Sequence, residues 1–147
     1  MNFAAILDTL AANLGTDTAL NDFCLAQWGK PFAAKKGYKK RHEIGMDELP
    51  VARLTQPRLR KAAVATRVAF QPHVTMRVYA GFLCEDVEQA ADLAIQLGDL
   101  LGAVAVTTAS ALGLVAEEID CVTDEGQLLP SCFLVMDITL RGVPVAA

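Results

Sequence analysis

The fold is decided by the stretch HVTMRVYAGFLCEDVEQAADLAIQLGDLL, residues 73–101. Its first part, Val74–Phe82, alternates apolar and polar side chains with the period of two that is typical of a strand. Its second part begins at Asp86, a suitable N-cap, with Gln89 three positions later as in a capping box. The segment therefore predicts a strand that runs straight into a helix ending near Leu101. We expect the apolar stripe of this helix at Val87, Ala90, Ala91, Ala94, Ile95, Gly98 and Leu101, with Glu88, Asp92, Gln96 and Asp99 outside it.

Two shorter helices are predicted ahead of this unit. Apolar residues recur at helical spacing between Asn2, a suitable N-cap, and Gly15, which ends the first helix. The second helix is expected from Asp17 to the Gly-Lys-Pro sequence that starts at Gly29. The segment Asn21–Trp28 is also compatible with an extended conformation because it is short and contains β-tolerant residues.

The remaining regular segments are short and strand-like. At 147 residues the chain fits one domain, residues 1–147. Runs of strands beside helices predict an α+β fold with a mixed, mainly antiparallel sheet. Strands are expected at Val51–Thr55, Ala63–Phe70, Leu114–Val122 and Ser131–Leu140, with a basic connection at Gln56–Lys61 and a turn at Asp124-Glu125-Gly126.

The apolar content is high, with 53% hydrophobic residues. The longest weakly charged run, Leu100–Ala116, contains threonine, serine and glycine, and it reaches only the lower length limit of a membrane span. We interpret it as a buried helix followed by a loop or by extra interface surface, and predict no membrane partner. The sequence Met1-Asn2-Phe3 has no basic n-region, so no signal peptide is expected.

Motifs for chemistry are weak. The four cysteines form no CxxC pair, and neither His42 nor His73 is near one of them, so no metal or cofactor is predicted. Ser110 is not in a nucleophile elbow, and no glycine-rich phosphate loop is present. The acidic residues Glu117, Glu118, Asp120, Asp124 and Glu125 lack the ligand spacing of a calcium loop and are better read as a solvated turn. We predict that the chain is not an enzyme.

Charge is divided unevenly along the chain. Residues 1–77 contain twelve of the thirteen Lys and Arg residues but only six carboxylates, whereas residues 78–147 contain one cation and eleven carboxylates. A chain polarised in this way is suited to associate with copies of itself head to tail.

The most basic segment is a loop expected over residues 30–46, where no apolar period is present, so we predict that it is exposed and mobile. Cations beside a stacking tyrosine could follow a nucleic-acid backbone. The net charge of −4 favours instead a loop that orders on an acidic partner. The candidate contact residues are Lys35, Lys36, Tyr38, Lys39, Lys40 and Arg41.

The order of these elements resembles the tail terminator (tail completion) proteins of long-tailed bacteriophages, of which the lambda-type minor tail protein is the best known. The matching features are the N-terminal helix over Ala5–Leu14, the loop ahead of Glu48-Leu49-Pro50-Val51-Ala52, the Val74–Phe82 strand followed by its helix, and the closing strands around Asp124-Glu125-Gly126. The chain departs from the family in its strongly basic loop and in the Ala/Thr-rich segment 103–113.

The resemblance implies a sheet with helices packed on one side, and six subunits assembled as a ring without catalysis. Such a ring caps the tail tube, stops its polymerisation and joins tail to head, so the expected partners are copies of itself, the tail-tube protein and a head-completion protein. The expected location is the head-proximal end of the virion tail, after assembly in the host cytoplasm, with DNA only passing through the lumen. The basic loop would face the lumen or the terminal ring of the tube.

Two alternative functions remain. The first is a head–tail connector or other tail subunit, and the second is a nucleic-acid-binding protein using Lys30–Arg41. The candidate ring-interface residues are Arg53, Arg58, Arg60, Glu88, Asp92, Asp124 and Glu125.

Overall fold

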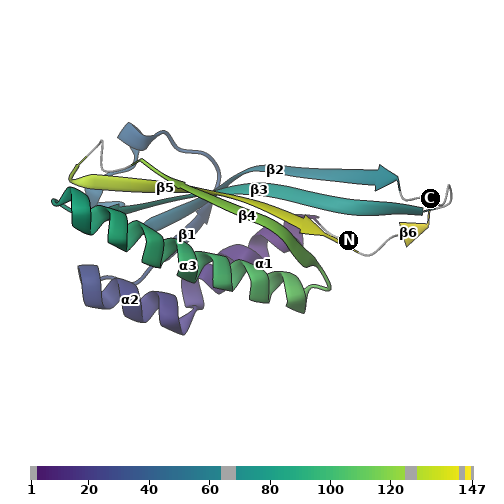
Figure 1. Ribbon diagram of the computed structural model, residues 1–147, viewed down its shortest axis with the longest axis horizontal. Helices are drawn as coiled ribbons and strands as arrows, with labels where there is room; N and C mark the ends of the chain where they lie inside the picture. The colour runs from purple at the N-terminus through teal and green to yellow at the C-terminus, as the bar shows by residue number, and fades with distance from the viewer. Residues whose placement is uncertain (1–2, 64–68, 125–128, 143–144, 147) are drawn as a thin grey trace.

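The computed structural model describes residues 3–63, 69–124, 129–142 and 145–146. Five strands form one sheet in the order β1-β2-β3-β5-β4, and the short β6 (Val145–Ala146) pairs with the start of β3. All neighbouring strands are antiparallel except β1 and β2. Three α-helices lie on one side of this sheet (Figure 1). The predicted α+β fold with a mixed, mainly antiparallel sheet and helices on one side is confirmed.

The first two helices are where the sequence predicts them. α1 covers Phe3–Thr16 and α2 covers Thr18–Trp28. The carboxylate of Asp17 accepts the Leu20 N–H at 3.0 Å, which satisfies one of the free donors at the start of α2. Gly29 ends α2 with φ of 67°, a left-handed conformation that glycine adopts at little cost. The predicted cap Asn2 lies outside the described residues.

The centre of the sheet consists of β3 (Ala69–Leu83) and β5 (Ser131–Arg141). Their register joins Val78 to Met136 and Ala80 to Leu134, and all four side chains are buried against the helices. The period-two prediction for β3 is therefore correct. Along the helix-covered face, the two strands contribute Val74, Met76, Val78, Ala80, Phe82, Cys132, Leu134, Met136, Ile138 and Leu140 to the main core.

β2 is longer than predicted and covers Val51–Ala63. The prediction of a basic connection over Gln56–Lys61 is wrong, because these residues belong to this strand. The pairing with β3 shifts between Thr55 and Arg58, and Gln56 has φ of 51°. This bulge places a proline where the ladder needs no N–H donor, which the period-two pattern cannot reveal. The strand expected over 63–70 lies partly outside the described residues.

α3 covers Val87–Ala111, so it continues through most of the Ala/Thr-rich segment. The predicted cap is present, since the Asp86 carboxylate accepts the Gln89 N–H at 3.1 Å. The predicted stripe is partly wrong: Val87 and Ile95 are exposed, as is Ala91. The side chains that contact the sheet instead follow a rotated stripe, and the buried set is Ala90, Leu93, Ala94, Leu97, Leu101, Val104, Ala105, Thr108 and Ala109.

β4 (Val115–Thr123) forms one edge of the sheet and pairs with β5. On the other side, β1 (Ala33–Lys36) pairs in parallel with residues 51–54 of β2. Beyond that point the far half of β2 has no outer neighbour among the described strands. Figure 1 shows β2 and β3 projecting together past the end of the helix layer. Among the described strands, one edge of the sheet is thus β4, and the other is β1 followed by the far half of β2.

Candidate functional site

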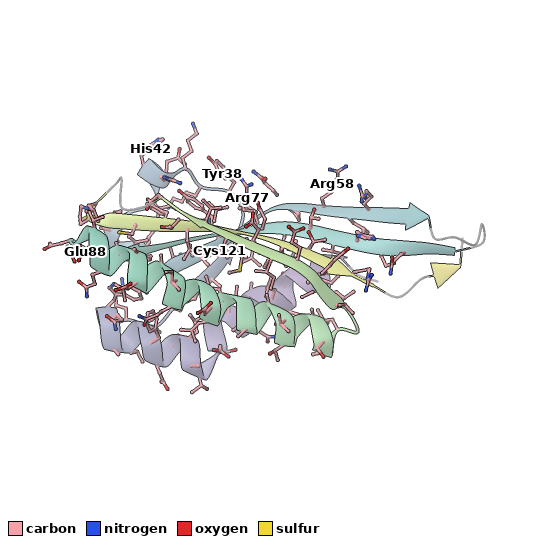
Figure 2. The ribbon with its side chains drawn as sticks, viewed as in Figure 1. Tyr38, His42, Arg58, Arg77, Glu88 and Cys121 are labelled. Carbon is pink, nitrogen blue, oxygen red and sulfur yellow. The ribbon has the colours of Figure 1, made fainter. Side chains whose placement is uncertain are left out.

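The loop expected over residues 30–46 is folded onto the sheet face that the helices leave open. Its first part is the strand β1, and two 3-10 turns follow at Arg41–Glu43 and Met46–Glu48. The prediction of a loop is therefore wrong for residues 33–36, which form a strand. Figure 2 shows Tyr38 and His42 on the side of the sheet away from the helices. Beneath the turns lies a small second core, made of Ile44, Leu49, Val51 and Phe133.

Arg41 holds this segment to the sheet. Its guanidinium carbon lies 5.5 Å from the ring centres of both Tyr79 and Phe133, which stack on one another at 5.2 Å. A guanidinium nitrogen also lies 3.8 Å from the Asp124 carboxylate. Cation–π contacts and a partly desolvated ion pair both stabilise such a contact. Arg41 thus has an intramolecular role that the sequence did not predict, and its contact with a partner stays a prediction.

Other loop cations also contact this chain. Lys36 pairs with Asp8, and Lys39 pairs with Glu48 at 2.9 Å. The hydrogen bond from Lys39, followed by that from the Gly45 N–H, lowers the pKa of Glu48. The candidate partner contacts that stay exposed without an ion pair in the described structure are Lys35, Tyr38 and Lys40.

Two of the predicted ring-interface residues also have intramolecular roles. Arg53 donates to the carbonyl oxygens of Gly37 at 2.8 Å and Lys36 at 3.0 Å, which fixes the end of β1. The Asp124 side chain is only 2% exposed, and it accepts the Phe133 N–H at 3.2 Å. The Asp124 side chain is therefore largely covered within its own chain, whereas Arg53 keeps a partly exposed side chain. The predicted Glu125 lies outside the described residues.

Arg58 and Arg60 lie on the open face in the far half of β2 (Figure 2 labels Arg58). Both are exposed, and neither guanidinium group has a hydrogen bond or ion pair within the described part of the chain. A shallow hollow of about 190 Å³ beside them is lined by His73, Thr75 and Thr139 as well. These two arginines are therefore available to a partner.

The opposite edge is acidic. On β4, Glu118 and Asp120 are exposed, and their register partners on β5, Thr139 and Asp137, lie on the open face. Glu117, at the bulge between Ala116 and Glu118, lies 3.5 Å from His73 Nδ1. Glu88 and Asp92 are exposed on α3, as predicted. The structure thus separates a basic edge on β2 from an acidic edge on β4.

The sequence missed the exposed apolar residues beside the acidic edge. Ile95 and Val106 on α3 are 64% and 49% exposed, and Val115 and Val122 on β4 are 54% and 61% exposed. Ile95 was assigned to the buried stripe because helical periodicity does not define which of two apolar stripes faces the sheet. The sequence contains no signal that separates the two stripes, because only the packing of Leu93 and Leu97 in the core distinguishes them from Ile95.

The residues that could carry chemistry are scattered over the described structure. They include no group of three His, Cys, Asp or Glu residues placed to hold a metal ion. Burial raises the pKa of the Cys24 thiol to about 12 and that of Cys132 to about 11, which keeps both protonated and weakly nucleophilic at neutral pH. Ser110 is exposed near the end of α3. α3 is long and apolar enough to cross a membrane, but core helices share this composition, and here one face packs on the sheet.

No protein-family model and no curated protein matches this chain.

Proposed function

We propose that this protein is a structural subunit of a phage or prophage virion, a tail terminator that forms a ring on the end of the tail tube. The observation that supports this function best is that one sheet has two unpaired edges of opposite charge: Arg58 and Arg60 at one, Glu118 and Asp120 at the other. A patch that contacts a different patch on the next copy is a heterologous interface, which closes into a ring when the rotation allows. The element order and its resemblance to tail terminators supply the hexamer and the position on the tail.

The fold supports a rigid assembly unit. The helices cover one face through the main core, and the loop over residues 30–46 covers one end of the other face, where its Ile44 packs in a cluster with Leu49 and Phe133. Both edges are therefore presented by the same packed sheet, so their relative position does not depend on a flexible linker. In this proposal Lys35, Tyr38 and Lys40 remain exposed for the terminal ring of the tube or the lumen.

The alternative of a nucleic-acid-binding loop receives less support. A backbone-binding surface needs several cations free to displace counterions. Lys36, Lys39 and Arg41 are already close to carboxylates of their own chain. The other alternative is a head–tail connector or a different tail subunit, which would use the same edges. It differs from a tail terminator in its partner, because a tail terminator binds the end of the tail tube.

The experiment is reconstitution with a phage tail-tube protein that polymerises into tubes. We expect purified protein to form closed rings, seen by negative-stain electron microscopy and sedimentation, and to bind one end of polymerised tubes and stop their growth. Rings that bind only a portal or connector complex would support the connector instead. A protein that stays monomeric at high concentration and leaves tube length unchanged would refute the proposal.

A further inference from the structure

The edge strand β4 has two features of an acceptor for another strand. Within the described sheet it pairs with β5 alone, so the outward N–H and C=O groups of Val115–Thr123 are unpaired. Unpaired strand edges pair readily with another chain unless they are covered. Val115 and Val122 are more than half exposed along this edge. The strand is thus open and partly apolar.

A groove runs beside β4 on the helix-covered side. It has a volume of about 330 Å³ and lies between α3 and β4, with Ile95, Gly98, Ile119 and Cys121 among its lining residues. A Cβ atom at Gly98 would lie 3.2 Å from the Cys121 sulfur, so the absence of a side chain there lets helix and strand approach closely. Asp99 lines the same groove. The acceptor edge therefore has an apolar groove with an acidic margin.

The far half of β2 has complementary features. Arg58 and Arg60 point to the open face because they pair with Thr75 and His73 of β3. Leu59 pairs with the core residue Val74, so it points to the helix-covered side, yet it is 40% exposed because the strand passes beyond the helices. One side of this strand segment is basic and the other is apolar.

The topology fixes the direction in which the two edges would meet. β2, β3, β5 and β4 are successively antiparallel, so β2 and β4 run in opposite directions. A neighbouring copy that continues the sheet would thus set its β2 antiparallel to β4 and keep its helices on the same side. Arg58, Thr75, Thr139 and Glu118 occupy one rung of the ladder. A neighbour displaced sideways without sliding along the strands would place Arg58 beside Glu118.

We infer that the far half of β2 in one copy, Arg58–Ala63, adds as an antiparallel strand to β4 of the next copy. In that register Arg58 lies opposite Glu118 on the open face, with Asp120 two residues farther along β4. Arg60 lies at the rung of Val115, and Leu59 lies at the rung of Ala116 on the helix-covered side. This inference names the partner surface within the proposed self-assembly and rests on that proposal. The two edges cannot meet within one chain because β3 and β5 lie between them.

A cysteine pair tests the contact directly. Arg58→Cys with Glu118→Cys, in a Cys121→Ser background that removes the exposed native thiol, should give intermolecular disulfides on oxidation with diamide. Three inter-strand steps, roughly 14 Å, separate the two positions within one chain, beyond the roughly 7 Å limit for a disulfide. The matched control pairs Arg58→Cys with Asp22→Cys, an exposed acidic position on α2. We expect a ladder up to the full oligomer for the first pair and background linkage for the control.

Charge reversal gives a second measurement. Arg58→Glu with Arg60→Glu should weaken self-association roughly tenfold or more at low salt, and Glu118→Lys with Asp120→Lys should do the same. Each variant alone should fail to form a closed ring, because its two edges carry the same charge. Mixing the two variants should restore rings of alternating copies, since each acidic edge then meets a basic one, and all four substitutions in one chain should also restore the ring. The control Asp22→Lys should leave association unchanged.

The outcomes separate this inference from the proposed function. Rings that cap tubes but show equal cross-linking of the test and control pairs, with no rescue by the fourfold variant, would overturn the edge contact and leave the tail terminator intact. Specific cross-links in an assembly that does not bind tubes would support the edge contact and refute the terminator. If Arg58→Glu with Arg60→Glu keeps self-association but abolishes binding of duplex DNA, the arginines bind nucleic acid and the inference is wrong.

Discussion

The cations of the loop over residues 30–46 and those in the far half of β2 look alike in sequence but have different surroundings. Lys36, Lys39 and Arg41 lie beside carboxylates of their own chain, whereas Arg58 and Arg60 have no such partner in the described structure. The denser cluster is thus mostly used to fix the fold, and the sparser one is available for assembly. Cation density along a chain is a poor guide to a binding surface, because a partner needs cations that are not already neutralised.

The largest expected effect on stability comes from the contact between the loop and the sheet, where Phe133 lies in the second core. Phe133→Ala removes a ring that is 2% exposed and stacked on Tyr79, and it should lower the free energy of unfolding by about 3–4 kcal/mol. Urea denaturation followed by circular dichroism measures this difference. Val122→Ala, at a site 61% exposed on β4, is the control and should change stability by less than about 0.5 kcal/mol. An equal loss of unfolding free energy in the two variants would contradict the packing of the loop on Phe133.

Arg41→Ala should have the next largest effect. It removes the cation over two aromatic rings and leaves the nearly buried Asp124 carboxylate without that cation, at a cost of about 1–3 kcal/mol. Lys40→Ala, the adjacent exposed cation, should be within about 0.5 kcal/mol of the parent in the same denaturation experiment. If the two substitutions lower the free energy of unfolding equally, Arg41 is an ordinary surface cation. Arg41 would then not differ from Arg58 and Arg60 in its role in stability.

A smaller effect should appear in the pH dependence. Hydrogen bonds from Lys39 and the Gly45 N–H lower the pKa of Glu48 in the folded state. A lowered folded pKa means that the stabilisation is present above the unfolded pKa, roughly 4.3, and is lost as the pH falls through the folded value. The stability difference between the parent and Glu48→Gln should therefore be larger at pH 7 than near pH 3. A difference that does not change with pH would contradict the Lys39 contact.

Substitution of Arg58 and Arg60 is expected to have the smallest effect on the stability of the monomer and the largest effect on self-association. Arg58→Ala with Arg60→Ala should leave the free energy of unfolding of the monomer within about 0.5 kcal/mol of the parent, because neither side chain has a partner in the described structure. Sedimentation should nevertheless show weaker self-association. A large loss of monomer stability would show that these arginines are structural, like Arg41.

Local signals in the sequence predicted most of the elements. The caps Asp17 and Asp86 act on donors three residues away, and the alternation of β3 reports one covered face, so both can be read from a short window. The extent of β2 could not be read this way, because a bulge at residues 55–58 resets its period. The buried stripe of α3 was also misassigned, since Ile95 and Leu97 are equally apolar and only packing distinguishes them.

The α+β class, the positions of the caps and the uneven distribution of charge can all be read from residue types and from neighbours within a few positions. Which charges are neutralised depends instead on contacts between residues far apart in the chain. Arg41 meets Asp124 because sheet pairing brings together residues more than eighty positions apart, and Arg58 stays open because β1 pairs with β2 only as far as Leu54. Coulomb and cation–π contacts act over a few ångströms in space and not along the sequence, so the register of the strands assigns each cation its role.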